Sequence, residues 1–337
     1  MLSEILNHAS KESIRVRFYI DGYHGYLLAK AVAELHREHW RKVRAAFSKN
    51  DPRFEIFDFE PTPERLAEIL AGLLEWSVGP IVKSVERKFE RYGQSVITKP
   101  EADMLSNPYY RDIFGQWKDF DASEKVFISV EHDGVVFAPT YDRPQMLRDL
   151  QLWENELTTG VKHEKDLLAR IAVERRQIES GKFTDTEAFY NALGRKTGNL
   201  SQYGQRRLQK ENNKSIFVEK SVDEDLNSSI WFDAVRKDEQ SKIDLFVIVT
   251  NDGDHAPHAA RLRAAGKRVS IFSYVEKPAR ALLDAVGKNN VLDLLTCSRG
   301  FDFADVWLKL PDEDSLQFLQ DIQQQWHWWV QNGDVIE

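Results

Sequence analysis

The feature that most constrains the fold is a short apolar run in the last third of the chain. Residues 245–249 read Leu-Phe-Val-Ile-Val, between Asp244 and Thr250. A run this short, rich in β-branched side chains, is typical of a strand, and a strand that is apolar at every position needs cover on both faces. The run therefore predicts a parallel sheet packed between layers of helices.

Strand-like and helix-like segments alternate around this run. Strands are predicted at residues 14–20, 54–59, 216–218 and 268–272. Helices are predicted at residues 26–47, 64–91, 163–180, 225–235 and 258–265. Such alternation is typical of an α/β protein with a Rossmann-like parallel sheet and right-handed crossovers.

The alternation of strand-like and helix-like segments is interrupted in the middle of the chain, and this interruption predicts the domain organisation. We expect an α/β core made of residues 14–62 and 213–310. A mostly helical insertion at 63–212 separates the two pieces, and a further helix is expected within the C-terminal segment 311–337.

Two parts of the insertion are not predicted to be helical. Residues 126–138 read as a β-hairpin that turns at Asp133-Gly134, because Asp-Gly is a favoured turn dipeptide. Residues 194–214 are polar with few apolar side chains, so we interpret them as a loop or linker.

Charge and cysteine content exclude several classes of protein. With 46 basic and 54 acidic residues the net charge is −8, so the chain lacks the overall positive charge that would attract nucleic acid. Cys297 is the single cysteine, which excludes an intramolecular disulfide and a cysteine-rich zinc site. No apolar stretch approaches the ~18 residues of a membrane span and the N-terminus lacks an apolar leader. We therefore expect a cytoplasmic protein without a membrane partner.

Acidic residues follow three of the predicted strands. They are Asp21 after the first strand, Asp223 and Asp225 after the short strand, and Asp252 and Asp254 after the apolar run. Ligands of an open parallel sheet gather at the carboxyl ends of its strands, so we expect these side chains to meet there. Clustered carboxylates repel each other unless a cation neutralises them, and Mg²⁺ or Mn²⁺ suits oxygen ligands. One such Asp alone is more often a turn former or helix N-cap, so the prediction rests on their coincidence.

Three segments of the chain resemble the NYN domain family, which belongs to the PIN-like nuclease superfamily. Residues 220–223 read Lys-Ser-Val-Asp, where the family has a Lys-Gly-Val-Asp-like segment. Residues 251–254 read Asn-Asp-Gly-Asp, where the family has an Asp-rich turn, and residues 262–269 match its Leu-Arg-x-x-Gly-Lys-x-Val pattern. With the Asp after the first strand, the resemblance covers roughly 14–30 and 215–310.

The resemblance implies a compact Rossmann-like fold and Mg²⁺- or Mn²⁺-dependent ribonuclease chemistry. It assigns metal binding and catalysis to Asp21, Asp223, Asp252 and Asp254. Secondary candidates near the site are His24, Asp225, Asn251 and His255. Our first hypothesis is therefore a metal-dependent endoribonuclease that cleaves RNA phosphodiester bonds.

The chain also departs from the family pattern. His24, Ser229 and His255 stand where the family often has Asn, Asp and Phe. These departures motivate a second hypothesis, a catalytically weakened NYN-like module that binds RNA or a protein. The Asp-x-Asp sequence after a strand also suggests a Toprim-like DNA enzyme as a third. Dinucleotide and P-loop motifs are absent.

A basic segment offers a surface for RNA. Residues 195–214 contain six basic residues and one acidic residue, with Tyr203 among them. Positive charge for phosphates and aromatic faces for bases is the combination that single strands need. We expect Arg206, Arg207 and Lys210 to contact single-stranded RNA. A protein partner or a second copy of the chain is expected at the insertion or at the C-terminal cluster Trp326, Trp328 and Trp329.

Overall fold

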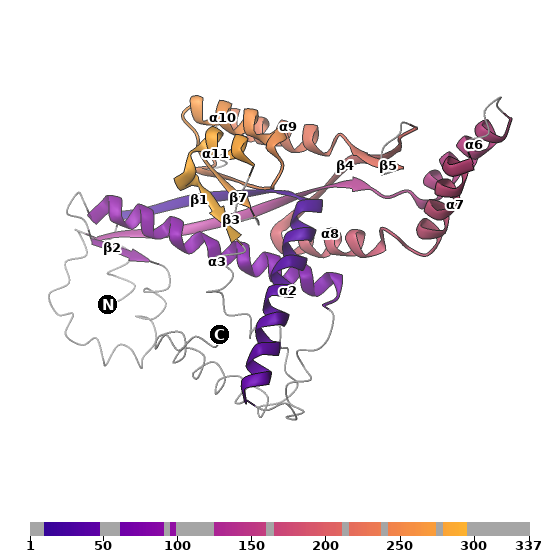
Figure 1. Cartoon of the computed structure of the whole chain (residues 1–337). Coiled ribbons are helices and arrows are strands. Elements are labelled where there is room, and N and C mark those ends of the chain that lie inside the picture. Colours follow the sequence, from indigo (N-terminus) through magenta and orange to yellow (C-terminus); the bar gives the residue numbers. More distant parts are fainter. Residues whose placement is uncertain are drawn as a thin grey trace.

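A computed structural model shows one large sheet with helices on both faces (Figure 1). It describes residues 10–47, 61–90, 95–98, 125–159, 165–210, 216–236, 242–273 and 279–294. The strands are β1 (Ser10–Asp21), β2 (Ser95–Thr98), β3 (Lys125–Thr140), β4 (Gly198–Leu208), β5 (Phe217–Lys220), β6 (Leu245–Val249), β7 (Arg268–Ser273) and β8 (Val291–Asp293). The α-helices are α2 (Gly22–Phe47), α3 (Pro63–Glu90), α6 (Arg143–Thr159), α7 (Lys165–Glu179), α8 (Thr184–Thr197), α9 (Val222–Val235), α10 (Ala256–Ala264) and α11 (Arg280–Val286). Two short 3₁₀ helices are η4 (Gly253–His255) and η5 (Lys288–Asn290).

The strand order places β1 at the centre of the sheet. The order is β5-β4-β3-β1-β6-β7-β8, with β2 also paired to β3. All pairings are parallel except that of β4 with β5. The chain adds β3 and β4 on one side of β1 and then β6, β7 and β8 on the other. The order therefore reverses beside β1, and ligands of open α/β sheets bind at such a reversal, outside the carboxyl ends of the strands.

The two faces of the sheet are covered by different helices, as the apolar run predicts. In β6, Leu245, Val247 and Val249 join one core with apolar residues of α2, α3 and α8. Phe246 and Ile248 point the other way and join a second core with α9, α10 and α11. Figure 1 shows these two helical layers on opposite sides of the strands. The prediction of a mostly parallel sheet between helices is confirmed.

The hairpin predicted at residues 126–138 is wrong. These residues belong to the single strand β3, which pairs in parallel with β1 along the whole length of β1. Asp133 lies in mid-strand because Arg17 of β1 binds it, with Nε 2.9 Å from Oδ1. Gly134 lies against Phe18 and Thr197, where a Cβ atom would be within 3.3 Å of both side chains. Asp133-Gly134 is a dipeptide typical of turns, but here it lies within a strand. Arg17 neutralises Asp133, and the missing side chain of Gly134 allows Phe18 and Thr197 to pack closely.

The loop predicted at residues 194–214 is also wrong over most of its length, because 198–208 form β4. The strand looked polar because two of its inward positions are Gly204, which is buried, and Arg206, whose side chain is 8% exposed. Gln205, which lies between these two positions, and Arg207, which follows them, are exposed. Residues 63–212 thus supply β2, β3 and β4 to the sheet, while α6 and α7 extend beyond its end (Figure 1).

Several predictions fall outside the described residues. They concern the strand at 54–59, the C-terminal helix and its three tryptophans. Among the helices that the structure does describe, none combines the length and the apolar character that crossing a membrane requires.

Candidate metal centre

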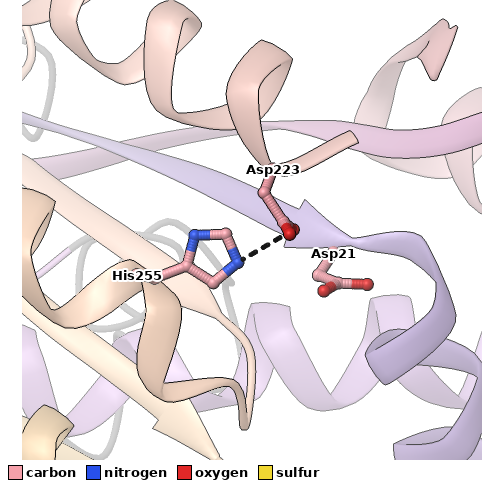
Figure 2. Close-up of side chains that lie close together, drawn as sticks. All are labelled: Asp21, Asp223 and His255. Atoms are coloured by element: carbon pink, nitrogen blue, oxygen red, sulfur yellow. Dashed lines mark ion pairs between the residues drawn. The ribbon is translucent and has the colours of Figure 1, made fainter. Parts of the chain in front are cut away.

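Two carboxylates and one imidazole meet at the carboxyl end of the central strands. Asp21 is the last residue of β1, Asp223 lies in the first turn of α9, and His255 ends η4. One ligand atom from each residue lies within 4.8 Å of the other two. Figure 2 shows the side chains converging from these three elements. The structure therefore brings Asp21 and Asp223 together, and it adds His255 to them.

The cluster is buried on one side and open on the other. Asp21 is 6% exposed and His255 is completely buried. The side chain of Asp223 is 48% exposed. A ligand can therefore approach past Asp223, while the other two groups are held in the protein interior.

The backbone before α9 is strained, and this strain directs Asp223 toward the cluster. Ser221 adopts a left-handed φ of 71°, which costs a residue other than glycine about 1 kcal/mol or more. The chain turns here from β5 into α9, so Asp223 falls in the first turn of the helix. The corresponding position of the NYN pattern is glycine, which adopts this conformation freely.

Asn227 fixes the orientation and the proton of His255. The two side chains are both buried, and Nδ1 of His255 lies 3.3 Å from Oδ1 of Asn227. A carbonyl oxygen can only accept a hydrogen bond, so the proton must be on Nδ1. In the neutral ring the lone pair of Nε2 then faces the two aspartates. Among the described residues Nε2 has no hydrogen-bond partner, as expected of an atom placed to bind a ligand.

Asp223 and His255 also interact electrostatically. Nε2 of His255 lies 3.4 Å from Oδ1 of Asp223. When the ring of His255 also carries a proton on Nε2, its hydrogen bond lowers the pKa of Asp223 below the usual value, although partial burial acts in the opposite direction. The charges of His255 and His24 add to the lowering. Asp223 is therefore held as a carboxylate, the form in which it binds cations.

His24 holds Asp21 by two contacts. Its backbone N–H donates to Oδ1 at 3.1 Å, and its ring Nδ1 lies 2.7 Å from Oδ2. Burial opposes protonation of His24, but the hydrogen bond and charge of Asp21 outweigh it and raise the pKa of His24 above its usual value. The charges of Asp252 and Asp223 act in the same direction. His24 is therefore an electrostatic partner of the acidic cluster rather than a surface residue.

Asp252 and Asp254, which the sequence assigned to the metal, are not part of the three-residue cluster. The Asp252 carboxylate accepts a hydrogen bond from the backbone N–H of Asp254 at 2.9 Å, so it is the N-cap of η4. The backbone N–H of Asp252 in turn donates to Oγ1 of Thr250 at 3.1 Å. The Asp254 side chain is exposed. Their assignment to a metal stays a prediction.

The other secondary candidates bind neighbours within the protein. Asp225 accepts a hydrogen bond from the hydroxyl of Ser201 on β4 at 2.6 Å. Asn251 accepts one from the hydroxyl of Ser273 on β7, also at 2.6 Å. The first contact connects α9 to β4 and the second connects the loop after β6 to β7, so these residues stabilise the edge on which the cluster lies.

The three predicted RNA-binding residues differ in their environments. Arg206 lies 3.0 Å from Glu219, and its guanidinium stacks on Phe183 with 4.1 Å from Cζ to the ring centroid. The charge of Arg206 is therefore used inside the protein. Lys210 forms an exposed ion pair with Glu156, and Arg207 is exposed. Arg207 and Lys210 remain accessible to a nucleic acid.

The spacing and chemistry of the cluster fit a divalent cation. Mg²⁺ binds its ligands at about 2.0–2.1 Å, so ligands on opposite sides of the ion lie about 4 Å apart. Separations of at most 4.8 Å among the three ligand atoms are close to this limit. Carboxylates suit Mg²⁺ and Mn²⁺, whereas imidazole suits later transition metals better. A mixed set of two carboxylates and one imidazole therefore fits a divalent metal ion.

Sequence reasoning missed Asn227. A signal was present, because Asn227 follows Asp223 by four residues on a predicted helix and so lies on the same face. Its importance depends on His255, which arrives from a different element and which only the tertiary structure places beside it.

The fold and the cluster together define a class: a three-layer α/β protein with a potential metal site at the carboxyl edge of a parallel sheet. The family model of the NYN domain matches residues 162–292, which confirms the resemblance found in the sequence. The match contains Asp223 and His255, whereas Asp21 comes from β1, outside the match. No curated protein and no solved structure shows significant similarity to the chain.

Proposed function

We propose that the protein is a metal-dependent ribonuclease whose cation is held by Asp21, Asp223 and His255. The observation that carries this proposal is the convergence of two carboxylates and a buried imidazole, with Nε2 directed at the carboxylates. NYN domains are generally nucleases, and the match to this family supports RNA as the substrate.

Each residue of the cluster has a role that follows from its surroundings. Asp21 and Asp223 supply negatively charged oxygens, and His255 supplies a neutral nitrogen whose direction Asn227 sets. A hydrogen bond to the ring nitrogen that does not bind the metal fixes the tautomer of a ligating histidine. His24, whose ring Nδ1 lies 2.7 Å from Oδ2 of Asp21, is close enough to the cluster to give a proton to the oxygen that leaves. A bound divalent cation would polarise the phosphate and lower the pKa of an attacking water.

One contact favours the second hypothesis, a module with little or no catalytic activity. Nδ1 of His24 lies 2.7 Å from Oδ2 of Asp21, so an imidazolium can neutralise this carboxylate in place of a metal. In that case the acidic edge would be stable without a cation, and the protein would bind RNA or a protein without cleaving it.

Calorimetric titration with Mn²⁺, followed by cleavage assays on labelled single-stranded RNA, tests the proposal. We expect the wild-type protein to bind Mn²⁺ and to cleave RNA in a reaction that EDTA stops. Asp21→Asn should lose both properties. Asp284→Asn, at an exposed position on α11, is the matched control and should lose neither. RNA cleavage that persists in Asp21→Asn would refute the assignment, and a wild-type protein that does not bind Mn²⁺ would support the inactive module.

Asp254→Asn separates the site seen in the structure from the one assigned by resemblance. Asp254 is exposed and lies outside the three-residue cluster. If the cluster alone holds the cation, Asp254→Asn should bind Mn²⁺ with wild-type affinity. A large loss of affinity would assign Asp254 a direct role in metal binding.

A further inference from the structure

Helix α9 presents apolar side chains on two faces. One face carries Leu226 and Ile230, which are fully buried against the sheet. The opposite face carries Phe232 and Val235, which are 61% and 65% exposed. Large apolar side chains with such exposure are rare on the described surface, and a helix that is apolar on both faces normally has cover on both.

The outer face of α9 forms one wall of a groove that begins at the candidate metal centre. The other wall comes from η4 and the first turn of α10, through Asp254 and His258. The groove has a volume of about 730 Å³, within the usual range for ligand pockets. Figure 1 shows α9 and α10 together on one side of the sheet. The residues of α9 that line it are Asp223, Glu224, Asn227, Ser228, Trp231, Phe232 and Val235.

The residues that line the groove change from acidic at one end to aromatic at the other. Asp223, a member of the metal-binding cluster, lies at one end, and the aromatic residues Trp231 and Phe232 lie two to three helical turns away. At a rise of 1.5 Å per residue, the distance along α9 from Asp223 to Phe232 is about 13 Å. Polar groups that can bind ribose or base edges lie between them. A chain with a phosphate at one end and flat apolar groups further along fits this sequence of surfaces.

The aromatic end is ordered and carries a positive charge. The indole N–H of Trp231 donates to Nδ1 of His258 at 3.4 Å, so the neutral imidazole carries its proton on Nε2 and can donate it. The guanidinium of Arg236 lies over the ring of Phe232, with Cζ 4.7 Å from the ring centroid. Nε of Arg236 also lies 3.6 Å from Oδ1 of Asp233, and the Arg236 side chain is 39% exposed. The exposed part of the guanidinium can contact a phosphate beside a base that stacks on these rings, whereas the acidic end of the groove needs a bound cation to attract a phosphate.

We propose that this groove binds the single-stranded RNA next to the cleaved phosphodiester, with Phe232 and Trp231 as the platform on which its bases stack. The inference rests on the proposed ribonuclease function and adds the path of the substrate. Base stacking on aromatic side chains tolerates every base, so the groove selects single strands rather than a sequence. A duplex, whose bases are already stacked on each other, cannot use the platform.

Binding can be measured apart from cleavage. Fluorescence anisotropy is recorded on the full chain, in EDTA, with a labelled single-stranded RNA of about eight nucleotides and with an abasic strand of the same length. Stacking on one aromatic ring contributes about 1–3 kcal/mol, so Phe232→Ala should weaken RNA binding on the order of tenfold or more. The abasic strand should bind both proteins equally. Leu152→Ala, on the far helix α6, is the matched control because Leu152 is also 61% exposed.

Two further substitutions distinguish stacking from general apolar contact. Phe232→Trp keeps an aromatic face and should keep RNA affinity. Phe232→Leu keeps apolar surface without a ring and should behave like Phe232→Ala. Equal affinity in Phe232→Leu and the wild type would overturn the proposal that the bases stack on this ring. A change of oligomeric state in Phe232→Ala, with unchanged RNA affinity, would overturn it in favour of a second copy of the chain.

The inference and the proposed function can fail separately. If Phe232 carries RNA affinity but no cleavage occurs with Mn²⁺, the groove is supported and the enzymatic function is refuted. If RNA is cleaved with Mn²⁺ while Phe232→Ala binds and cleaves RNA like the wild type, the groove is refuted and the enzymatic function stands. A wild-type protein that has no affinity for RNA, either in EDTA or with Mn²⁺, refutes both.

Discussion

A partly buried ion network ties β1 to β3 and α9, and Arg17 is at its centre. The Arg17 guanidinium binds Asp133 of β3, and its Nη1 lies 2.8 Å from Oδ2 of Asp233 on α9. The hydrogen bond with Asp133, with Asp233 adding to it, raises the pKa of Arg17 above its usual value, so it stays charged. Tyr19 also donates to Asp233, at 2.8 Å. Because α9 carries Asp223, this network also positions the candidate metal centre.

We expect Arg17→Met to destabilise the protein by about 3 kcal/mol at neutral pH. Removal of one partner from a buried ion pair costs about 3–5 kcal/mol, because the remaining charge is left without compensation. Asp233 is 7% exposed and would remain buried, whereas Asp133 is 45% exposed and regains water. The hydroxyl of Tyr19 would still donate to Asp233, and Nε of Arg236 would still lie 3.6 Å from Oδ1 of Asp233. The expected loss is therefore at the lower end of the range.

The pH dependence of this loss gives a second signature. Loss of the nearer of two cations makes the charged form of a buried carboxylate less stable, so its folded-state pKa lies higher in the variant than in the wild type. The folded variant then binds more protons than the folded wild type, so its stability relative to the wild type falls as pH rises through these two pKa values. The deficit of Arg17→Met relative to the wild type should therefore be larger at neutral pH than near pH 4. Asp233→Asn added to Arg17→Met should remove this difference.

Urea unfolding followed by circular dichroism measures both effects. Arg15→Met is the matched control, because Arg15 lies on the same strand and pairs with the exposed Glu131 of β3 at 3.2 Å. An exposed pair contributes about 0–1 kcal/mol, so this control should be close to the wild type. Equal losses for Arg17→Met and Arg15→Met, or a deficit that does not change with pH, would contradict the role assigned to the network.

Three other substitutions test the geometry around the cluster. Asn227→Ala should raise the Kd for Mn²⁺ about 10- to 100-fold in calorimetry, because His255 loses the group that fixes its tautomer, and an unchanged Kd would argue against this role. Ser221→Gly should raise the free energy of unfolding by about 0.5–1 kcal/mol, because it relieves a left-handed φ; a lower midpoint in urea would contradict this. Gly204→Ala should lower it by about 1–3 kcal/mol, because the new Cβ would lie 2.2 Å from Cγ2 of Val222 and force β4 away from α9; unchanged stability would show that the contact relaxes freely.

Local patterns in the sequence were sufficient for much of the α/β architecture. The apolar run of β6 predicted a sheet covered on both faces, and the segments that resemble the NYN family predicted the family that residues 162–292 match. These features succeed because side-chain periodicity records how many faces of an element are buried, which is a property of the element itself.

Two strands were missed because some of their residues are stabilised only by partners in other elements of the chain. Asp133 suits a turn unless Arg17 neutralises it on the adjacent strand, 116 residues earlier. Arg206 suits an exposed loop unless Glu219 and Phe183 enclose it. Propensities refer to isolated segments, and such pairings override them.

The sequence by itself determined that this chain forms a layered α/β protein with acidic residues at the ends of its strands. The tertiary structure alone decided which of these residues meet. It placed His255 beside Asp21 and Asp223, and it left Asp252 to cap η4. The physical reason is that distances between side chains from different elements depend on strand order and helix packing across the whole chain, which local sequence does not specify.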